Sequence, residues 1–189
     1  MVAIANRNSQ QLRELVDDLL DMEKLVSGKM TMSLKSESVH PMITESVERL
    51  SAYALESGVS IRVSDHYPDC QVLVDRPRLG QALINLLSNA VKFSPEHSTV
   101  WVETELETDR LRIAVRDQGP GIPENFRERI FQKFAQADSS DTRGKRGTGL
   151  GLAITREIMS QMGGDVGFRS TPGQGSTFWL ELPVSSVTD

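Results

Sequence analysis

The sequence predicts an α+β domain preceded by one long helix, and a change of pattern along the chain leads to this prediction. Up to about Lys29, apolar residues recur in alternating steps of four and three, as in a helix with one narrow apolar stripe. From Ser36 onward, helical periodicity alternates with short period-two stretches bounded by glycine and proline. A chain of 189 residues, 38% hydrophobic and 25% charged, suffices for one buried core and one appendage. We therefore expect an appendage over 1–30 and a domain over 36–189.

The first helix carries its apolar residues on a heptad stripe, and Gly28 is suited to end it. So narrow a stripe on so long a helix favours contact with helices of another chain, and packing on its own domain is the alternative. Asn8 interrupts the stripe, so self-association through it should be weak. The stripe consists of Met1, Ala5, Asn8, Leu12, Leu15, Leu19, Met22 and Val26.

The first half of the domain is predicted to contain strands and two helices. A strand near Lys35–Val39 precedes a helix over Pro41–Glu56, in which apolar residues recur at helical spacing. Val59–Val63 and Gln71–Val74 are extended runs, and the turn-like residues between them predict a hairpin. A helix over Arg76–Lys92 follows, with leucines on one face and a proline in its first turn.

The second half is predicted to contain two hairpins separated by a loop and a helix. Thr99–Leu106 and Arg110–Asp117 alternate apolar and polar residues around a short turn. A loop of about thirty residues then runs to Gly149, and loops of that length in compact domains are usually functional. A helix around Leu150–Met162 precedes the last hairpin. That hairpin consists of Asp165–Ser170 and Ser176–Leu182.

Composition excludes several classes of protein. The net charge of -5 offers no basic surface for nucleic acid, and the clustered cations are only Arg143, Lys145 and Arg146. One cysteine, Cys70, rules out an intrachain disulfide and indicates a reducing compartment, so we expect a cytoplasmic location. No apolar run approaches the roughly 20 residues that cross a bilayer, so we expect no direct membrane contact from these residues.

Three polar patterns stand out as candidate binding residues. Asn85, Asn89 and Lys92 share one stripe of their helix, where amide oxygen and ammonium groups suit a cation and phosphate oxygens; a solvated edge is the alternative. By strand parity, Asp117 faces the layer between sheet and helices and could accept a hydrogen bond from an amine such as that of adenine. The glycines after it, Gly119 and Gly121, are equally compatible with a simple Asx turn.

The third pattern is a glycine-rich turn that opens into a helix, from Gly147 to Leu152. Free backbone amides at a helix N-terminus form an anion site. The spacing matches neither the dinucleotide fingerprint nor a P-loop, because no strand precedes the glycines and the Lys-Ser/Thr pair is missing. A glycine cap with a loop is the alternative.

Taken in order, these patterns strongly resemble the ATP-binding domain of sensor histidine kinases, within the gyrase, Hsp90, histidine kinase and MutL ATPase superfamily. The resemblance runs from about Ser36 to Pro183, and residues 19–30 are similar to the end of the second helix of that family's dimerisation and phosphoacceptor hairpin. The motifs are Asn-x-x-x-Asn-x-x-Lys-Phe, Asp-x-Gly-x-Gly, Phe131 with Phe134, Gly-Thr-Gly-Leu-Gly-Leu, and Gly173-Gln174-Gly175-Ser176-Thr177-Phe178.

The resemblance implies a two-layer α/β sandwich of the Bergerat type, a mixed sheet covered on one face by helices. It implies ATP and Mg2+ as cofactors, with Asn89 as the metal ligand, Asn85 and Lys92 as catalytic residues beside the triphosphate, and a mobile lid over Gln136–Arg146. The implied nucleotide contacts are Asn89, Lys92, Asp117, Gly119, Gly121, Phe134, Arg146, Gly147, Thr148, Gly149, Leu150, Gly151 and Thr177.

The resemblance also implies a protein-histidine kinase of two-component systems, with a response regulator as the eventual partner. Hydrolytic relatives carry glutamate where this chain has Asn85, and an amide cannot act as a base, which favours transfer to another nucleophile. None of His40, His66 and His97 lies on the first helix or precedes an acidic residue, so we expect the phosphoacceptor helix outside these residues. A stand-alone ATPase or serine kinase and a nucleotide-dependent interaction module are the alternatives.

Overall fold

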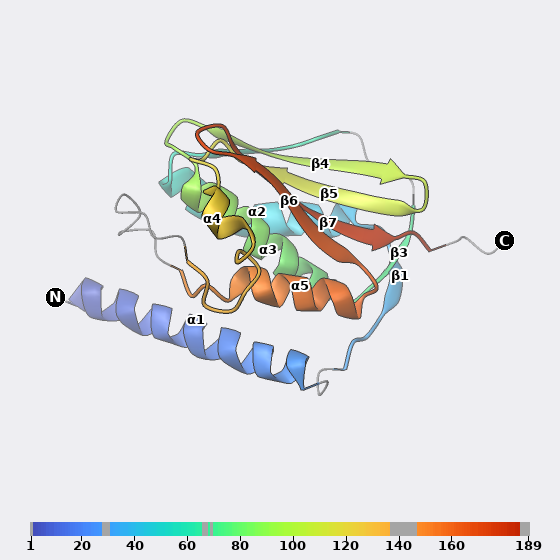
Figure 1. Ribbon diagram of the computed structural model, residues 1–189, viewed down its shortest axis with the longest axis horizontal. Helices are drawn as coiled ribbons and strands as arrows, with labels where there is room; N and C mark the ends of the chain where they lie inside the picture. The colour runs from blue at the N-terminus through green and yellow to red at the C-terminus, as the bar shows by residue number, and fades with distance from the viewer. Residues whose placement is uncertain (1, 28–30, 66–67, 69, 137–146, 186–189) are drawn as a thin grey trace.

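The structure is a computed structural model in which a mixed sheet is covered on one face by the helices α2, α3 and α5, as predicted (Figure 1). The long helix α1 lies outside this layer and runs alongside α5. The α+β class predicted from the sequence is therefore confirmed. The structure describes residues 2–27, 31–65, 68, 70–136 and 147–185.

The elements agree with the predicted ones to within a few residues at each end, and the short helix α4 is an addition within the predicted loop. The helices are α1 Val2–Val26, α2 His40–Glu56, α3 Arg76–Phe93, α4 Glu124–Arg127 and α5 Gly151–Gln161. The strands are β1 Lys35–Glu37, β2 Ser60–Val63, β3 Val72–Val74, β4 Thr99–Glu107, β5 Arg110–Arg116, β6 Asp165–Thr171 and β7 Gly175–Pro183.

The five-stranded sheet has the order β2-β4-β5-β7-β6, with β2 parallel to β4 and the other pairs antiparallel. The predicted hairpin between Val59–Val63 and Gln71–Val74 is wrong. β2 extends the large sheet beside β4, whereas β3 pairs with β1 in a separate two-stranded sheet. The connection from Val63 to Val72 is longer than the two to five residues of most hairpins, so it does not force neighbouring strands to pair.

The core lies between the sheet and its helices because each strand turns alternate residues inward. On β5 these residues are Leu111, Ile113 and Val115, all at most 1% exposed. They meet the leucine face of α3 and the apolar face of α5, where Leu83 and Ile154 are also at most 1% exposed. The polar stripe of α3 is thereby directed to the edge of this layer.

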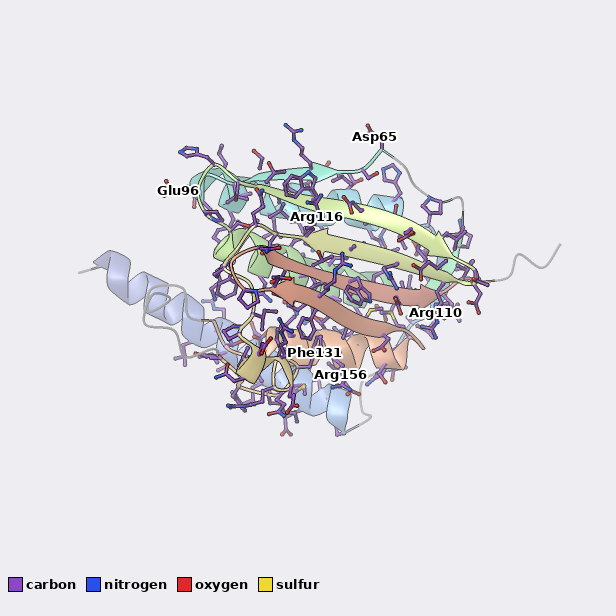
Figure 2. The ribbon with its side chains drawn as sticks, turned by 45° about the horizontal axis from the view of Figure 1, so that its top comes forward. Asp65, Glu96, Arg110, Arg116, Phe131 and Arg156 are labelled. Atoms are coloured by element: carbon purple, nitrogen blue, oxygen red, sulfur yellow. The ribbon has the colours of Figure 1, made fainter. Side chains whose placement is uncertain are left out.

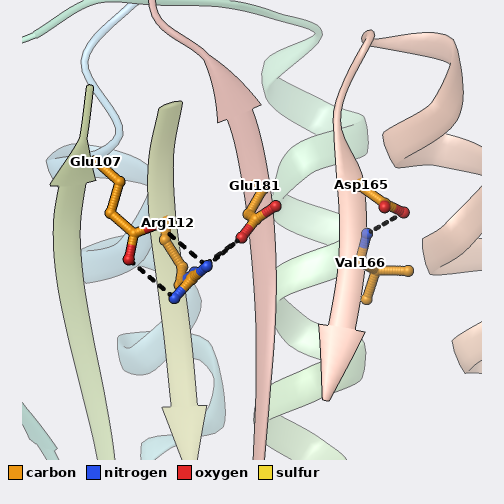
Figure 3. Close-up of polar contacts among 5 residues, drawn as sticks. All are labelled: Glu107, Arg112, Asp165, Val166 and Glu181. Carbon is orange, nitrogen blue, oxygen red and sulfur yellow. Dashed lines mark hydrogen bonds and ion pairs between the residues drawn. The ribbon is translucent and has the colours of Figure 1, made fainter. Parts of the chain in front are cut away.

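The opposite face of the sheet is polar. Arg112 of β5 lies between Glu107 and Glu181, with its Nη2 2.6 Å from Glu181 Oε1 (Figure 3). The Arg116 guanidinium lies 4.1 Å from the ring centroid of Trp101. Such cross-strand pairs are typical of a solvated sheet face.

Among the side chains of α1 that the structure describes, those in its C-terminal half pack on the domain. Met22 and Leu25 are 6% and 1% exposed, whereas Leu12 and Leu19 are 63% and 47% exposed. Leu25 lies outside the predicted heptad stripe, so the residues that contact the domain are only partly those of the stripe. No helix in the described part of the chain combines the length and the hydropathy that a bilayer span requires.

Candidate functional site

The three polar patterns predicted from the sequence come together along α3. A Cβ added at Gly119 would lie 2.9 Å from the carbonyl oxygen of Phe93, and one added at Gly147 would lie 2.9 Å from Lys92 Nζ. A Cβ at Gly151 would lie 3.5 Å from Asn85 Cγ. The glycines therefore allow both loops to approach the end of α3 closely.

Asp117 is a buried carboxylate with a fixed orientation. Its Oδ1 accepts hydrogen bonds from the backbone N–H groups of Gly119, at 2.8 Å, and Ser176, at 3.1 Å. Burial raises the pKa of the carboxyl group, and the two backbone N–H groups act in the opposite direction. Its Oδ2 has no hydrogen-bond partner among the described residues, so this oxygen is available to an amine of a ligand.

The loop after Asp117 packs closely against the turn between β6 and β7 and is hydrogen-bonded to it. Gly121 has φ +72°, and a Cβ there would lie 2.3 Å from the carbonyl oxygen of Thr171, so only glycine fits. The N–H of Ile122 donates to Ser170 Oγ at 2.8 Å, and that of Gly173 donates to the carbonyl of Pro120 at 2.7 Å. The loop is thus joined to the sheet on both sides.

Ser170 and Ser176 are residues of this site that the sequence analysis did not single out. Both are buried, and their hydroxyl oxygens lie 2.9 Å apart. Strand parity was the signal that could have found Ser176, because it lies two residues before Phe178 and four before the buried Leu180.

The same parity corrects the prediction for Thr177. In β7 this residue pairs with Arg116 of β5 and Arg169 of β6, both exposed on the outer face of the sheet. Its side chain therefore points away from Asp117, which argues against the implied nucleotide contact, and Ser176 is the residue that faces Asp117.

The polar stripe of α3 divides into residues with different surroundings. Asn85 Nδ2 donates to the carbonyl of Gly151 at 3.1 Å and lies 3.4 Å from Thr155 Oγ1, so it braces the start of α5. Asn89 is half-buried, and its amide has no hydrogen-bond partner within the described ranges. Lys92 brings its ammonium group beside Gly147. One amide of the stripe thus supports the fold, while the next is available to a cation.

The glycine-rich segment opens into α5 as predicted. Gly149 has φ +71°, and a Cβ there would lie 2.9 Å from the carbonyl carbon of Phe134. Thr148 Oγ1 accepts the N–H of Leu150 at 3.2 Å and donates to Asp18 Oδ2 of α1 at 2.8 Å. The segment is therefore held from one side by the Phe134 backbone and from another by α1.

The two phenylalanines between these motifs lie in different surroundings. The Phe134 ring is 60% exposed and lines a cavity of about 280 Å³ together with Leu19 and Met22 of α1. Phe131 packs edge-on against Phe168, and the guanidinium of Arg156 lies 5.9 Å from its ring centroid (Figure 2). Phe131 thus belongs to the domain itself, while Phe134 faces α1.

The predicted lid falls mostly outside the described residues, and so does the predicted contact Arg146. Of the lid range Gln136–Arg146, only Gln136 is described, and its Nε2 donates to the carbonyl of Gly147 at 2.9 Å. The start of the lid range therefore contacts the glycine-rich segment directly.

The part of the chain that carries most of these contacts, without α1, also matches a known family. Residues 74–186 match the family described as histidine kinase-, DNA gyrase B-, and HSP90-like ATPase. This span includes α3, Asp117 and the glycine-rich segment. The chain belongs to this ATPase family.

Relatives of this ATPase-family domain include histidine kinases in which it forms one part of a longer protein. The circadian input-output histidine kinase CikA of Synechococcus elongatus is 37% identical over 96% of this chain and 24% of its own length. The signal transduction histidine-protein kinase BarA of Escherichia coli is 35% identical over 93% of this chain and 20% of its own length. The chain thus spans about a quarter or less of these relatives.

Solved structures give the same result. Full-length ShkA in complex with AMPPNP is similar with a TM-score of 0.84 and 34% identity, over 98% of this chain and 39% of that one. The catalytic domain of histidine kinase ThkA is similar with a TM-score of 0.68 and 28% identity, over 80% of this chain and 96% of that one. The resemblance to the ATP-binding domain of sensor histidine kinases is therefore confirmed.

Proposed function

We propose that this domain binds ATP with Mg2+ and presents the γ-phosphate to a histidine on a helix that is not among these 189 residues, as the catalytic part of a protein-histidine kinase in two-component signalling. The observation that carries this proposal is the position of Asn85. This residue of α3 contacts the start of α5, where backbone amides suit phosphate groups, yet its own amide cannot deprotonate water. A positioned nucleotide beside an amide favours transfer to a separate nucleophile over hydrolysis.

The residues of α3 fit a magnesium ion that is held mainly by phosphate oxygens. Mg2+ commonly takes one or two protein ligands and completes its shell with phosphate oxygens and water. Among the described residues, no group of three or more His, Cys, Asp or Glu side chains could hold a metal alone. The half-buried amide of Asn89 supplies one oxygen, and Lys92 supplies a positive charge near the same phosphates. When bound, the ion would neutralise charge on the transferring phosphoryl group.

Calorimetry tests this assignment. Removing magnesium with a chelator, or replacing Asn89 with alanine, is expected to weaken ATP binding about tenfold or more, because each change removes a contact to a charged group. Ser88→Ala is the matched control, since its hydroxyl donates only to the carbonyl of Asn85 on the same helix, at 3.2 Å. An affinity for ATP that neither magnesium removal nor Asn89→Ala changes would show that α3 does not hold the metal.

We also propose weak self-association through α1, as expected of a helix whose heptad stripe is exposed from Leu12 to Leu19. Leu12 and Leu15 are 63% and 37% exposed on this stripe. Sedimentation velocity over a concentration series is expected to show a reversible dimer, which Leu12→Glu weakens because it places a charge in an apolar contact. Leu55→Glu is the control, since Leu55 is 80% exposed on α2. A chain that stays monomeric at every concentration contradicts self-association through α1.

The acceptor histidine helix and a response regulator are the partners that this proposal requires. The phosphoryl group must pass to an imidazole within near-attack distance, roughly 3–3.5 Å, which a neighbouring helix can reach if the domain moves relative to it. The exposed part of α1 supports such an arrangement, because a partner helix can pack on the stripe without displacing Met22 or Leu25. The relatives CikA and BarA support this arrangement as well, because they are histidine kinases much longer than this chain.

A further inference from the structure

The contact between α1 and the glycine-rich segment occupies hydrogen-bond donors of the candidate phosphate site. A threonine hydroxyl has one hydrogen to donate. That of Thr148 goes to Asp18 Oδ2, at 2.8 Å. The N–H of Leu150, which has no carbonyl partner within α5, donates to the oxygen of the same hydroxyl, at 3.2 Å. Two donors that could bind a phosphate oxygen are thus already used: the Thr148 hydroxyl by α1, and the Leu150 N–H by Thr148.

The carboxylate of Asp18 lies where the N-terminal end of α5 would attract a bound anion. Helix α5 has 11 residues, and its N-terminal end attracts negative charge. Asp18 brings a carboxylate to this end from another element. Burial raises the pKa of its carboxyl group most, the Thr148 hydroxyl lowers it, and the neighbouring charges of Asp21 and Asp17 raise it further. A triphosphate arriving at the same place would therefore meet a like charge.

Further contacts along α1 hold Asp18 in this position. One turn further along, Asp21 Oδ2 accepts hydrogen bonds from Arg78 Nη1 at 3.0 Å and Gln81 Nε2 at 2.9 Å. Two turns along, the carbonyl of Leu25 accepts a hydrogen bond from Gln161 Nε2 at 3.1 Å, and its side chain is buried. The docked helix thus contacts α3, the glycine-rich segment and α5 at regular helical spacing.

We propose that Asp18 is an intramolecular ligand of the phosphate-binding end of α5, and that it competes there with the phosphate groups of the nucleotide. This inference rests on the proposed role of Thr148 and Leu150 in binding ATP. Docking of α1 then lowers the affinity for ATP, and ATP loosens α1 by the same factor, because coupling between two binding events is reciprocal. The domain would hold α1 most firmly when no triphosphate is bound.

Calorimetry with Mg-ATP and with AMP tests the competition. Asp18→Asn keeps the size of the side chain and removes its charge, and is expected to tighten ATP binding at least about fivefold, the lower end of typical coupling. AMP binding is expected to stay unchanged, because AMP lacks the β- and γ-phosphates. Asp17→Asn is the matched control: it removes the same charge from an exposed neighbour on α1 that makes no hydrogen bond to Thr148, and should change the ATP affinity much less.

Hydrogen exchange of α1 gives a readout that does not depend on affinity. Amides of residues 12–26 are expected to exchange faster in wild type when Mg-ATP is added, and not when AMP is added. In Asp21→Asn, which loses the ion pair with Arg78, they should exchange faster without nucleotide, and ATP should bind more tightly. ATP binding that is equal or weaker in Asp18→Asn, or α1 exchange that ATP leaves unchanged, would overturn the competition while leaving the proposed function intact. A wild type that binds no ATP would contradict the proposed function itself.

Discussion

Replacing Asp117 with asparagine is expected to weaken ATP binding about ten- to a hundredfold, since a hydrogen bond to a charged group is worth roughly 1.5–3 kcal/mol. The proposed partner is the exocyclic amine of adenine, a donor that requires an acceptor. Oδ2 of the carboxylate is such an acceptor, with no partner among the described residues. In asparagine the corresponding atom is a nitrogen that only donates.

The same replacement should leave the fold intact, which separates a binding role from a structural one. The oxygen of asparagine can still accept the N–H groups of Gly119 and Ser176. Because burial raises the pKa of the Asp117 carboxyl group in the folded state, the charged form costs stability at pH values above its ordinary pKa. At neutral pH a neutral asparagine avoids this cost, so thermal denaturation should show a variant at least as stable as the wild type.

Two comparisons make the Asp117 prediction specific. Asp165→Asn serves as the control, because among the described residues Asp165 accepts only the N–H of Val166, at the far end of β6 (Figure 3). Guanine nucleotides serve as the second comparison, because guanine carries a carbonyl where adenine carries the amine. Equal losses for ATP and GTP in Asp117→Asn would assign this carboxylate to the loop structure and not to base recognition.

The chain alone is expected to bind ATP without accumulating phosphohistidine. Of its histidines, His40 begins α2 and His97 lies in the turn before β4, with φ +64°; both are exposed. His66 lies outside the described residues. Neither described histidine is on α1 or on the polar stripe of α3, and an acceptor must approach the phosphorus to roughly 3–3.5 Å. Incubation with ATP labelled at the γ-phosphate measures the outcome.

A phosphoacceptor hairpin from a related histidine kinase completes this experiment. Acid-labile label is expected only when the hairpin is added, and only on the hairpin. Asn89→Ala should reduce it, which ties the label to the nucleotide site. Comparable label on this chain alone, lost when one of its three histidines is replaced, would contradict an external acceptor.

Much of the fold followed from the sequence because periodicity fixes which residues are buried. The leucines of α3 and the alternation in β5 predicted both elements and placed Asp117 toward the helices, as the structure has it. Strand pairing did not follow, because short strands such as β2 and β3 carry too few residues to specify a neighbour. In the structure, β2 pairs with β4 at the edge of the large sheet, and β3 pairs with β1.

The sequence predicted which residues belong to the candidate site better than it predicted their hydrogen-bond partners and orientations. Motif order gave Asn85, Asn89 and Asp117, but the bond from Asn85 to Gly151 joins residues far apart in the sequence. Thr177 was misplaced because a motif match does not say which of two adjacent strand residues points inward. The contact from Asp18 to Thr148 joins residues 130 positions apart in the sequence, and no local pattern predicts it.

The close contact between the Asp117 loop and the β6–β7 turn implies that the two ends of the proposed nucleotide site differ in stiffness. With Gly121 pressed against Thr171 and Ile122 bonded to Ser170, the loop shares the stiffness of the sheet. In the proposed site, the conformational entropy of the adenine end is therefore lost when the protein folds, and base recognition draws little on binding energy. The proposed phosphate end is the glycine-rich segment, which contacts α1 and the Phe134 backbone, so we expect ordering on binding to be concentrated there. Signals that move α1 can then adjust how phosphates are held while the choice of base stays constant.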